Sequence, residues 1–129
     1  MKATRAPYTI VSAQSTAANY TSPAYSILDI DIQAVQVDYT GSPSGTFAIQ
    51  GSVNYQVDTL GNVINPGTFA NLYFSVNGAS PSSSVAVPAN PSPIIFDLYG
   101  SGVVALKVVY TGSGAGTFTA VVSGKRIGD

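Results

Sequence analysis

Several residue types that build catalytic and metal sites are missing from this chain. Its 129 residues include no Cys and no His. These absences exclude disulfides, thiol nucleophiles and zinc–thiolate sites, and they remove the commonest general base. Trp is absent too, and all six acidic residues are Asp. Carboxylate chemistry is therefore restricted to these six Asp side chains.

Charge is equally scarce. Charged residues make up 9% of the chain and its formal net charge is −1, against about 25% charged residues in an average globular domain. A surface with so few cations does not follow a phosphate backbone, so we expect no nucleic-acid partner. No apolar run approaches the roughly 18 residues of a membrane span, and the first 13 residues lack the continuous apolar segment of a secretory signal. We expect no membrane partner and synthesis in a cytoplasm.

What the chain does contain is a repeat. YTGSPSGTF at residues 39–47 returns as YTGSGAGTF at residues 110–118. Apolar residues alternate with polar ones before each copy, and the alternation keeps its phase between the copies. Each nonapeptide reads as a strand end, a Gly-containing turn and a strand start. The pattern predicts two copies of one β-hairpin.

Further alternating segments indicate more strands. The first hairpin should follow a strand with a bulge or break near Gln33 and Ala34, because the apolar phase changes there. A stiff connection is expected over residues 88–93, PANPSP. The remaining strands are expected at residues 8–11, 27–32, 72–76, 85–87 and 94–99. Residues 1–129 are thus expected to form one domain, an antiparallel β-sandwich (jelly-roll or immunoglobulin-like) of about eight or nine strands with an internal hairpin duplication.

Asp29 and Asp31 are the best candidates for chemistry. They lie two apart on one face of the strand expected at residues 27–32, about 7 Å from each other. With further oxygen donors such a pair could bind Ca²⁺, and its spacing also falls within the range of glycosidase carboxyl pairs. The favoured interpretation is a solvated strand face. We therefore predict no catalytic residue, no cofactor and no metal ligand, and leave the Ca²⁺ question open.

Aromatic and basic residues suggest where the surface makes contacts. Six aromatics fall on the apolar phase and are expected in the core: Tyr39, Phe47, Phe74, Phe96, Tyr110 and Phe118. Other tyrosines fall outside that phase, where Tyr is enriched at protein contacts. Four of the five basic residues stand near the chain ends, either as solubilising tails or as docking arms, with residues 1–7 as a candidate N-terminal arm. The candidate assembly contacts are Lys2, Arg5, Tyr8, Tyr73, Tyr99, Lys125 and Arg126.

The segments AVQVDYTGSPSGTFAIQGS and VVALKVVYTGSGAGTFTAVVSGK resemble a group of small virion structural proteins of tailed bacteriophages. In that group a "tG-x-x-x-Gt-f-x-iqgS" segment is followed some 60 to 70 residues later by a "vvYt-x-x-x-GtGt" segment that ends in Gly-Lys. The resemblance covers roughly residues 24–126. It implies no catalytic residues.

The resemblance implies a non-enzymatic virion protein assembled in the host cytoplasm. The expected role is a capsid decoration or accessory protein that binds the outside of a phage head and stabilises it. Its expected partners are the major capsid protein or other virion proteins, and further copies of itself in a homo-oligomer. The alternative is a receptor-binding or carbohydrate-binding module on a phage tail or head fibre. A secreted bacterial carbohydrate-binding domain is a third interpretation, which the missing signal and missing Trp disfavour.

Overall fold

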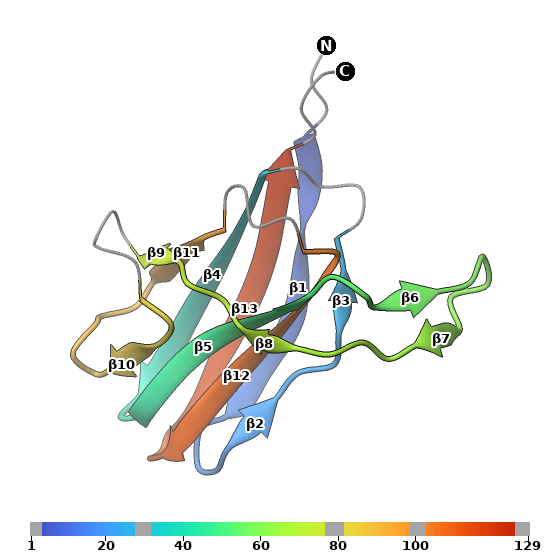
Figure 1. The fold of residues 1–129 in the computed structure, drawn as a ribbon. Coiled ribbons are helices and arrows are strands. Elements are labelled where there is room, and N and C mark those ends of the chain that lie inside the picture. The colour runs from blue at the N-terminus through green and yellow to red at the C-terminus, as the bar shows by residue number, and fades with distance from the viewer. Residues whose placement is uncertain (1–3, 28–31, 77–81, 99–102, 126–129) are drawn as a thin grey trace.

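A computed structural model describes residues 4–27, 32–76, 82–98 and 103–125 of the chain. The secondary structure assigned within these ranges is β-strand, in thirteen segments (Figure 1). The strands are β1 (Thr4–Ser15), β2 (Tyr20–Thr21), β3 (Tyr25–Ser26), β4 (Ile32–Gly41), β5 (Ser44–Ser52), β6 (Gln56–Val57), β7 (Val63–Asn65), β8 (Ala70–Asn71), β9 (Ser75–Val76), β10 (Val85–Val87), β11 (Ile94–Asp97), β12 (Ala105–Ser113) and β13 (Gly116–Lys125). No helix in the described ranges is long and apolar enough to cross a bilayer.

The strands form two sheets and one separate hairpin. Sheet A has five strands in the order β1-β13-β4-β11-β9. Sheet B has six: its path is β10-β5-β12-β2, with β8 also paired to β5 and β3 also paired to β12. The long strands β5 and β12 cross in front of β4, β13 and β1 in Figure 1, as in a two-layer sandwich. β6 and β7 pair only with each other and project from the side of the sandwich.

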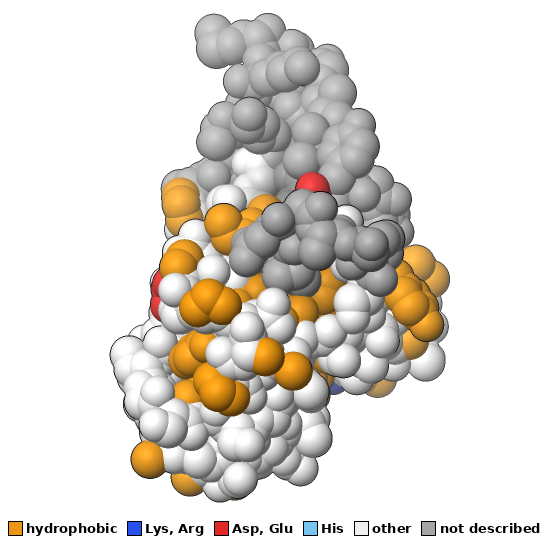
Figure 2. Space-filling view, turned by 90° about the vertical axis from the view of Figure 1, so that its left-hand side faces the viewer, with side chains coloured by type: hydrophobic (Ala, Val, Ile, Leu, Met, Phe, Trp, Pro, Cys, Tyr) orange, Lys and Arg blue, Asp and Glu red, His pale blue; other side chains and the backbone are white. Residues whose placement is uncertain are grey.

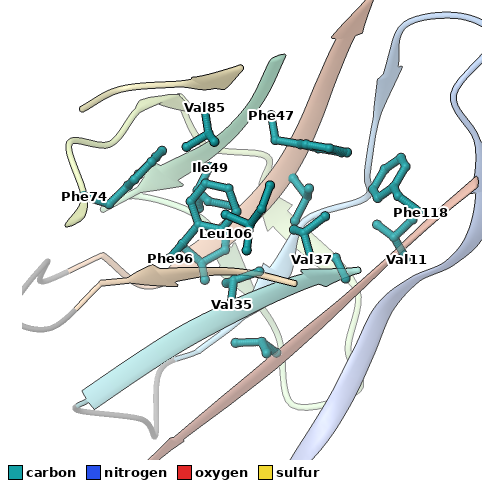
Figure 3. Packing of buried hydrophobic residues seen from close by; sticks show 14 of the residues in the cluster. Val11, Val35, Val37, Phe47, Ile49, Phe74, Val85, Phe96, Leu106 and Phe118 are labelled. Carbon is teal, nitrogen blue, oxygen red and sulfur yellow. The ribbon is translucent and has the colours of Figure 1, made fainter. Parts of the chain in front are cut away.

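The core lies between the sheets and is built by alternation along each long strand. Val35 and Val37 of β4 face inward, as do Leu106 and Val108 of β12, and all four are fully buried. Phe47, Tyr110 and Phe118 pack against one another at one end, with ring centroids 5.0 to 6.0 Å apart. Figure 3 shows Phe74, Ile49, Phe96 and Leu106 filling the other end. Of the six aromatic residues expected in the core, Phe47, Phe74, Phe96, Tyr110 and Phe118 are buried, and Tyr39 is half-buried.

The all-β antiparallel sandwich and its duplication are confirmed, but neither nonapeptide forms a hairpin. β4 pairs with β13, and β5 pairs with β12, each in antiparallel register. The turn after β4 carries the chain from sheet A to sheet B, and the turn after β12 carries it back from B to A. Each copy therefore pairs with the other copy rather than with itself. A shift of 71 residues takes β4 to β12 and β5 to β13. The β4–β13 pair therefore corresponds to the β12–β5 pair, which relates the two halves by approximate two-fold symmetry.

Pairs of glycines explain why the sequence at this crossing between sheets occurs twice in the chain. Gly41 lies opposite Gly116, and Gly45 lies opposite Gly112. A Cβ added to Gly41 would stand 2.7 Å from the Gly116 Cα and would also collide with the Ala115 carbonyl. A Cβ on Gly45 would stand 2.8 Å from the Gly112 Cα. Only glycine lets the paired strands approach this closely where the chain changes sheets.

Most other sequence predictions hold, with two corrections. The strands expected at 8–11 and 85–87 are found in β1 and β10, and residues 88–93 are irregular. Of the strand expected at 94–99, β11 covers 94–97, Leu98 lies outside the strand, and Tyr99 lies outside the described residues. The bulge expected near Gln33 and Ala34 is wrong, because β4 keeps an unbroken register with β13 from Ile32 to Gly41. Thirteen strands replace the expected eight or nine, since several two-residue strands lack alternation to detect. Most of the segment expected at 27–32, including Asp29 and Asp31, lies outside the described residues.

Candidate interaction surfaces

One end of sheet A gathers two of the basic residues selected from the sequence. Thr4 pairs with Lys125, and Arg5 pairs with Gly124. Arg5 and Lys125 therefore occupy neighbouring strands, one register position apart. Residues 4–7 of the expected N-terminal arm belong to β1, and Thr4 and Arg5 pair with β13. Lys2, Tyr99 and Arg126 lie outside the described residues.

The two described candidate tyrosines occupy different environments. Tyr8 is half exposed, and its ring stacks on Tyr25 of β3 with a centroid distance of 4.6 Å and an interplanar angle of 15°. The pair thus joins the edge strand of sheet A to an edge strand of sheet B. Tyr73 is 79% exposed, between β8 and β9. The structure does not bring Tyr8 and Tyr73 together on one strand or pairing.

The most prominent surface feature is one that sequence reasoning missed. Residues 53–69, which we call the projecting hairpin, contain β6, β7 and their turn and extend beyond β3, away from β4 and β11 (Figure 1). Leu60 is 85% exposed, Ile64 63% and Val63 54%. Large apolar side chains grouped on a protrusion in this way are typical of protein contact sites rather than of scattered surface residues.

The tip of the projecting hairpin is held rigidly by one carboxylate. Asp58 Oδ1 accepts hydrogen bonds from the backbone N–H groups of Leu60 and Asn62, both at 2.8 Å. Its Oδ2 accepts a further bond from Asn62 Nδ2 at 3.2 Å. Gly61 completes the turn with a φ of 86°, where a side chain would be strained. The bond from the Asn62 N–H is the main cause that lowers the pKa of Asp58 below its ordinary value.

The base of the projecting hairpin is anchored just as specifically. Asn54 Oδ1 accepts hydrogen bonds from the Ser52 hydroxyl at 2.8 Å and from the Thr68 N–H at 2.9 Å. This bridge joins the two legs of the protrusion where they leave the sandwich. Phe69 then lies under the Lys107 ammonium of β12, 4.3 Å from its Nζ to the ring centroid. The protrusion is preorganised at both ends, which lowers the entropy lost when it binds.

A hollow in the outer face of sheet A offers a second apolar surface, which we call the sheet A hollow. It has a volume of about 380 Å³ and is lined by Pro7, Ala34, Gln36, Ile95, Val121 and Ser123. These residues come from β1, β4, β11 and β13, and Ile95 is 42% exposed. The side of the molecule that carries β9, β10 and β11 shows few charged side chains, with hydrophobic groups among polar ones (Figure 2). The hollow therefore offers mainly apolar and neutral polar contacts.

A solved structure shares this fold. The crystal structure of the SPBc2 prophage-derived protein YomS aligns over 95% of both chains with a TM-score of 0.63 and 12% sequence identity. At that identity the likeness concerns the fold: two chains with little common sequence build the same arrangement along almost their full length. No protein-family model matches the chain, and no curated protein matches it in sequence.

The chemical candidate identified from the sequence is not part of these surfaces. Asp29 and Asp31 fall outside the described ranges, so the Ca²⁺ interpretation stays a prediction. Among the residues that the structure describes, no three His, Cys, Asp or Glu side chains cluster as metal ligands would. One signal for the projecting hairpin was available in the sequence. The run DTLGNVINPG places apolar residues among turn-forming Asp, Gly and Asn, and apolar residues inside turns are expected to be exposed.

Proposed function

We propose that this chain is a non-enzymatic structural protein of a tailed phage particle, and that it decorates the outside of the head. The observation that carries the proposal is the fold shared with a prophage-derived protein over 95% of both chains. The motif resemblance, which rests on different information, points to the same class of proteins. A rigid sandwich with preorganised, weakly charged protrusions suits repeated attachment to a shell, where modest contacts per copy add up to avidity.

The basic end of sheet A is the part of the surface that would face the capsid. Arg5 and Lys125 stand on adjacent strands, one register position apart. Cations in this position would direct one end of the sandwich toward acidic groups of the shell. This orientation leaves the projecting hairpin and the sheet A hollow available for contacts between neighbouring copies.

Cryo-electron microscopy of purified particles tests the proposed location. Sandwich-sized density repeated over the head is the expected result, and density confined to the tail or its fibres would contradict the decoration role. Co-sedimentation with heads that lack the protein tests the orientation. Arg5→Gln combined with Lys125→Gln should reduce occupancy, whereas Lys107→Gln, which removes a cation from sheet B, should not. An equal loss in both variants would show that net charge alone governs binding.

Receptor or carbohydrate binding is the second candidate, and the exposure of Tyr73 favours it. An aromatic ring that is 79% exposed offers a flat face on which a sugar can stack. If the chain is a receptor module, the purified protein should bind host cells or glycans without other virion proteins, and Tyr73→Ala should remove that binding. Unchanged binding by Tyr73→Ala would exclude this site.

A further inference from the structure

The projecting hairpin and the sheet A hollow are two apolar surfaces on different parts of one chain, so they cannot bury each other within that chain. The hairpin leaves the sandwich beyond β3, away from β4 and β11 (Figure 1), whereas the hollow is lined by residues of β1, β4, β11 and β13. The hairpin strands pair with no strand of either sheet. Leu60, Val63 and Ile64 therefore require a partner outside their own chain to become buried.

We propose that the projecting hairpin of one copy inserts into the sheet A hollow of a second copy. The projecting hairpin supplies Leu60 from its turn and Ile64 from β7, two of the most exposed large apolar side chains in the described ranges. The hollow supplies apolar walls from Pro7, Ala34 and Val121. A cavity of about 150 Å³ admits one benzene ring, so about 380 Å³ has room for two side chains of the size of Leu.

The electrostatics of the two surfaces agree with this pairing. The one carboxylate near the tip, that of Asp58, accepts hydrogen bonds from the N–H groups of Leu60 and Asn62 and from the Asn62 side-chain amide. The polar residues that line the hollow are Gln36 and Ser123, and neither is charged. The carboxylate of Asp38 borders the hollow, where it accepts a hydrogen bond from the Gln36 side-chain amide at 3.0 Å. Neither side must therefore strip water from an uncompensated charge when the two meet. A second copy supplies to each of these two surfaces the neutral, apolar counterpart that the other one offers.

The geometry makes the contact heterologous, because the two surfaces differ and lie on different parts of the molecule. Such head-to-tail contacts generate closed rings when the rotation between copies closes, and open chains when it does not. Within the described residues, β5 leads into the projecting hairpin after Ser52, whereas the equivalent strand β13 runs to Lys125, the last residue described. Each copy accordingly offers one hairpin and one hollow.

Mixing of complementary variants tests the proposal on the purified full-length chain. Wild type should form oligomers in sedimentation velocity, while Leu60→Ser combined with Ile64→Ser, and separately Ile95→Ser, should each weaken association at least about tenfold. These residues are exposed, and circular dichroism and thermal unfolding should confirm that each variant retains the fold. When the two variants are mixed, one intact hairpin meets one intact hollow, so 1:1 dimers and no larger species should form. A monomeric wild type, or mixtures that stay monomeric, would overturn the proposal.

Crosslinking gives an independent readout because the chain contains no Cys. Oxidation of a mixture of Leu60→Cys and Ile95→Cys chains should yield a covalent dimer, whereas Leu60→Cys or Ile95→Cys alone should yield little. Tyr73→Cys, exposed but outside both surfaces, serves as the matched control with Ile95→Cys. Equal yields in the control mixture would refute the contact. Both experiments use the isolated protein, so their failure leaves the head location to be judged separately on particles.

Discussion

At the scale of single residues, the glycines of the repeated nonapeptide separate two effects that are easily confused. Gly45 lies opposite Gly112, and an added Cβ would meet backbone atoms of Thr111 and Gly112. Gly61 at the hairpin tip has a φ of 86°, yet an added Cβ would have no atom within 4 Å. The first glycine is required for space and the second for backbone conformation.

Substitution should expose this difference. Gly45→Ala should lower the free energy of unfolding by about 2 kcal/mol or more, because two backbones at a strand crossing must separate. Gly61→Asn should cost less than about 1 kcal/mol, since Asn tolerates the left-handed region and the space is open. Urea denaturation measures both. A Gly45→Ala protein as stable as Gly61→Asn would show that the crossing is not tightly packed.

Asp58 allows a prediction about pH. Hydrogen bonds to its carboxylate, foremost from the Asn62 N–H, lower its pKa in the folded state below that in the unfolded state. The contribution of these bonds to the turn is therefore present above an unfolded pKa of about 3.9, and it is lost as the pH falls through the folded-state pKa. NMR titration should show the amide signals of Leu60 and Asn62 changing together with the Asp58 carboxyl, below about pH 4. An Asp58 carboxyl that titrates above its ordinary value would contradict the described turn.

At the scale of elements, the hydrogen bonds of Asn54 at the base of the projecting hairpin decide whether the hairpin is held rigidly on the sandwich. Asn54→Ala removes the acceptor shared by the Ser52 hydroxyl and the Thr68 N–H. Amide hydrogen exchange should accelerate across the projecting hairpin and stay unchanged in β12 and β13, because Asn54 is exposed and does not belong to the core cluster. Asn71→Ala is the matched control, since it removes one exposed side-chain bond to Gln50. Acceleration throughout both sheets would mean that the hairpin and the sandwich unfold as one unit.

The elements also show what sequence patterns reveal and what they conceal. Alternation predicted the inward faces of β4, β12 and β13, because a period of two depends only on which side of a strand is buried. It did not predict the strand partners. A Gly-rich turn serves equally to return the chain along one sheet or to carry it into the other. The choice between them depends on Gly41 meeting Gly116, a contact between segments that the local sequence does not connect.

Exposed apolar residues were concealed for a related reason. Leu60 and Ile64 are of residue types that are common in protein cores. The turn-forming Asp, Gly and Asn around them are a local signal of exposure, but the position of the turn outside the sandwich depends on the three-dimensional fold. The basic residues near the two chain ends were predicted only as solubilising tails or docking arms. The pairing of Thr4 with Lys125 brings Arg5 and Lys125 to the same end of sheet A. Similar chemistry at distant positions predicts proximity only when the topology joins those positions.

At the scale of the whole molecule, the pairing of Thr4 with Lys125 and the isolation of β6 and β7 from both sheets make a circular permutation informative. A short Gly/Ser linker between residues 129 and 1, with new ends between Leu60 and Gly61, would leave every pairing of sheets A and B in place. We expect the permuted chain to fold with the circular dichroism spectrum and thermal unfolding of the parent protein, because no core residue lies near the new ends.

Opening the chain instead between Ser42 and Pro43 interrupts the crossing from β4 to β5 and should lower the stability markedly. If both permutants fold equally well, the glycine crossing does not hold the two halves together. The first permutant also carries a cut hairpin tip, so it should remain monomeric while keeping the sandwich, which separates the assembly of copies from the folding of each one.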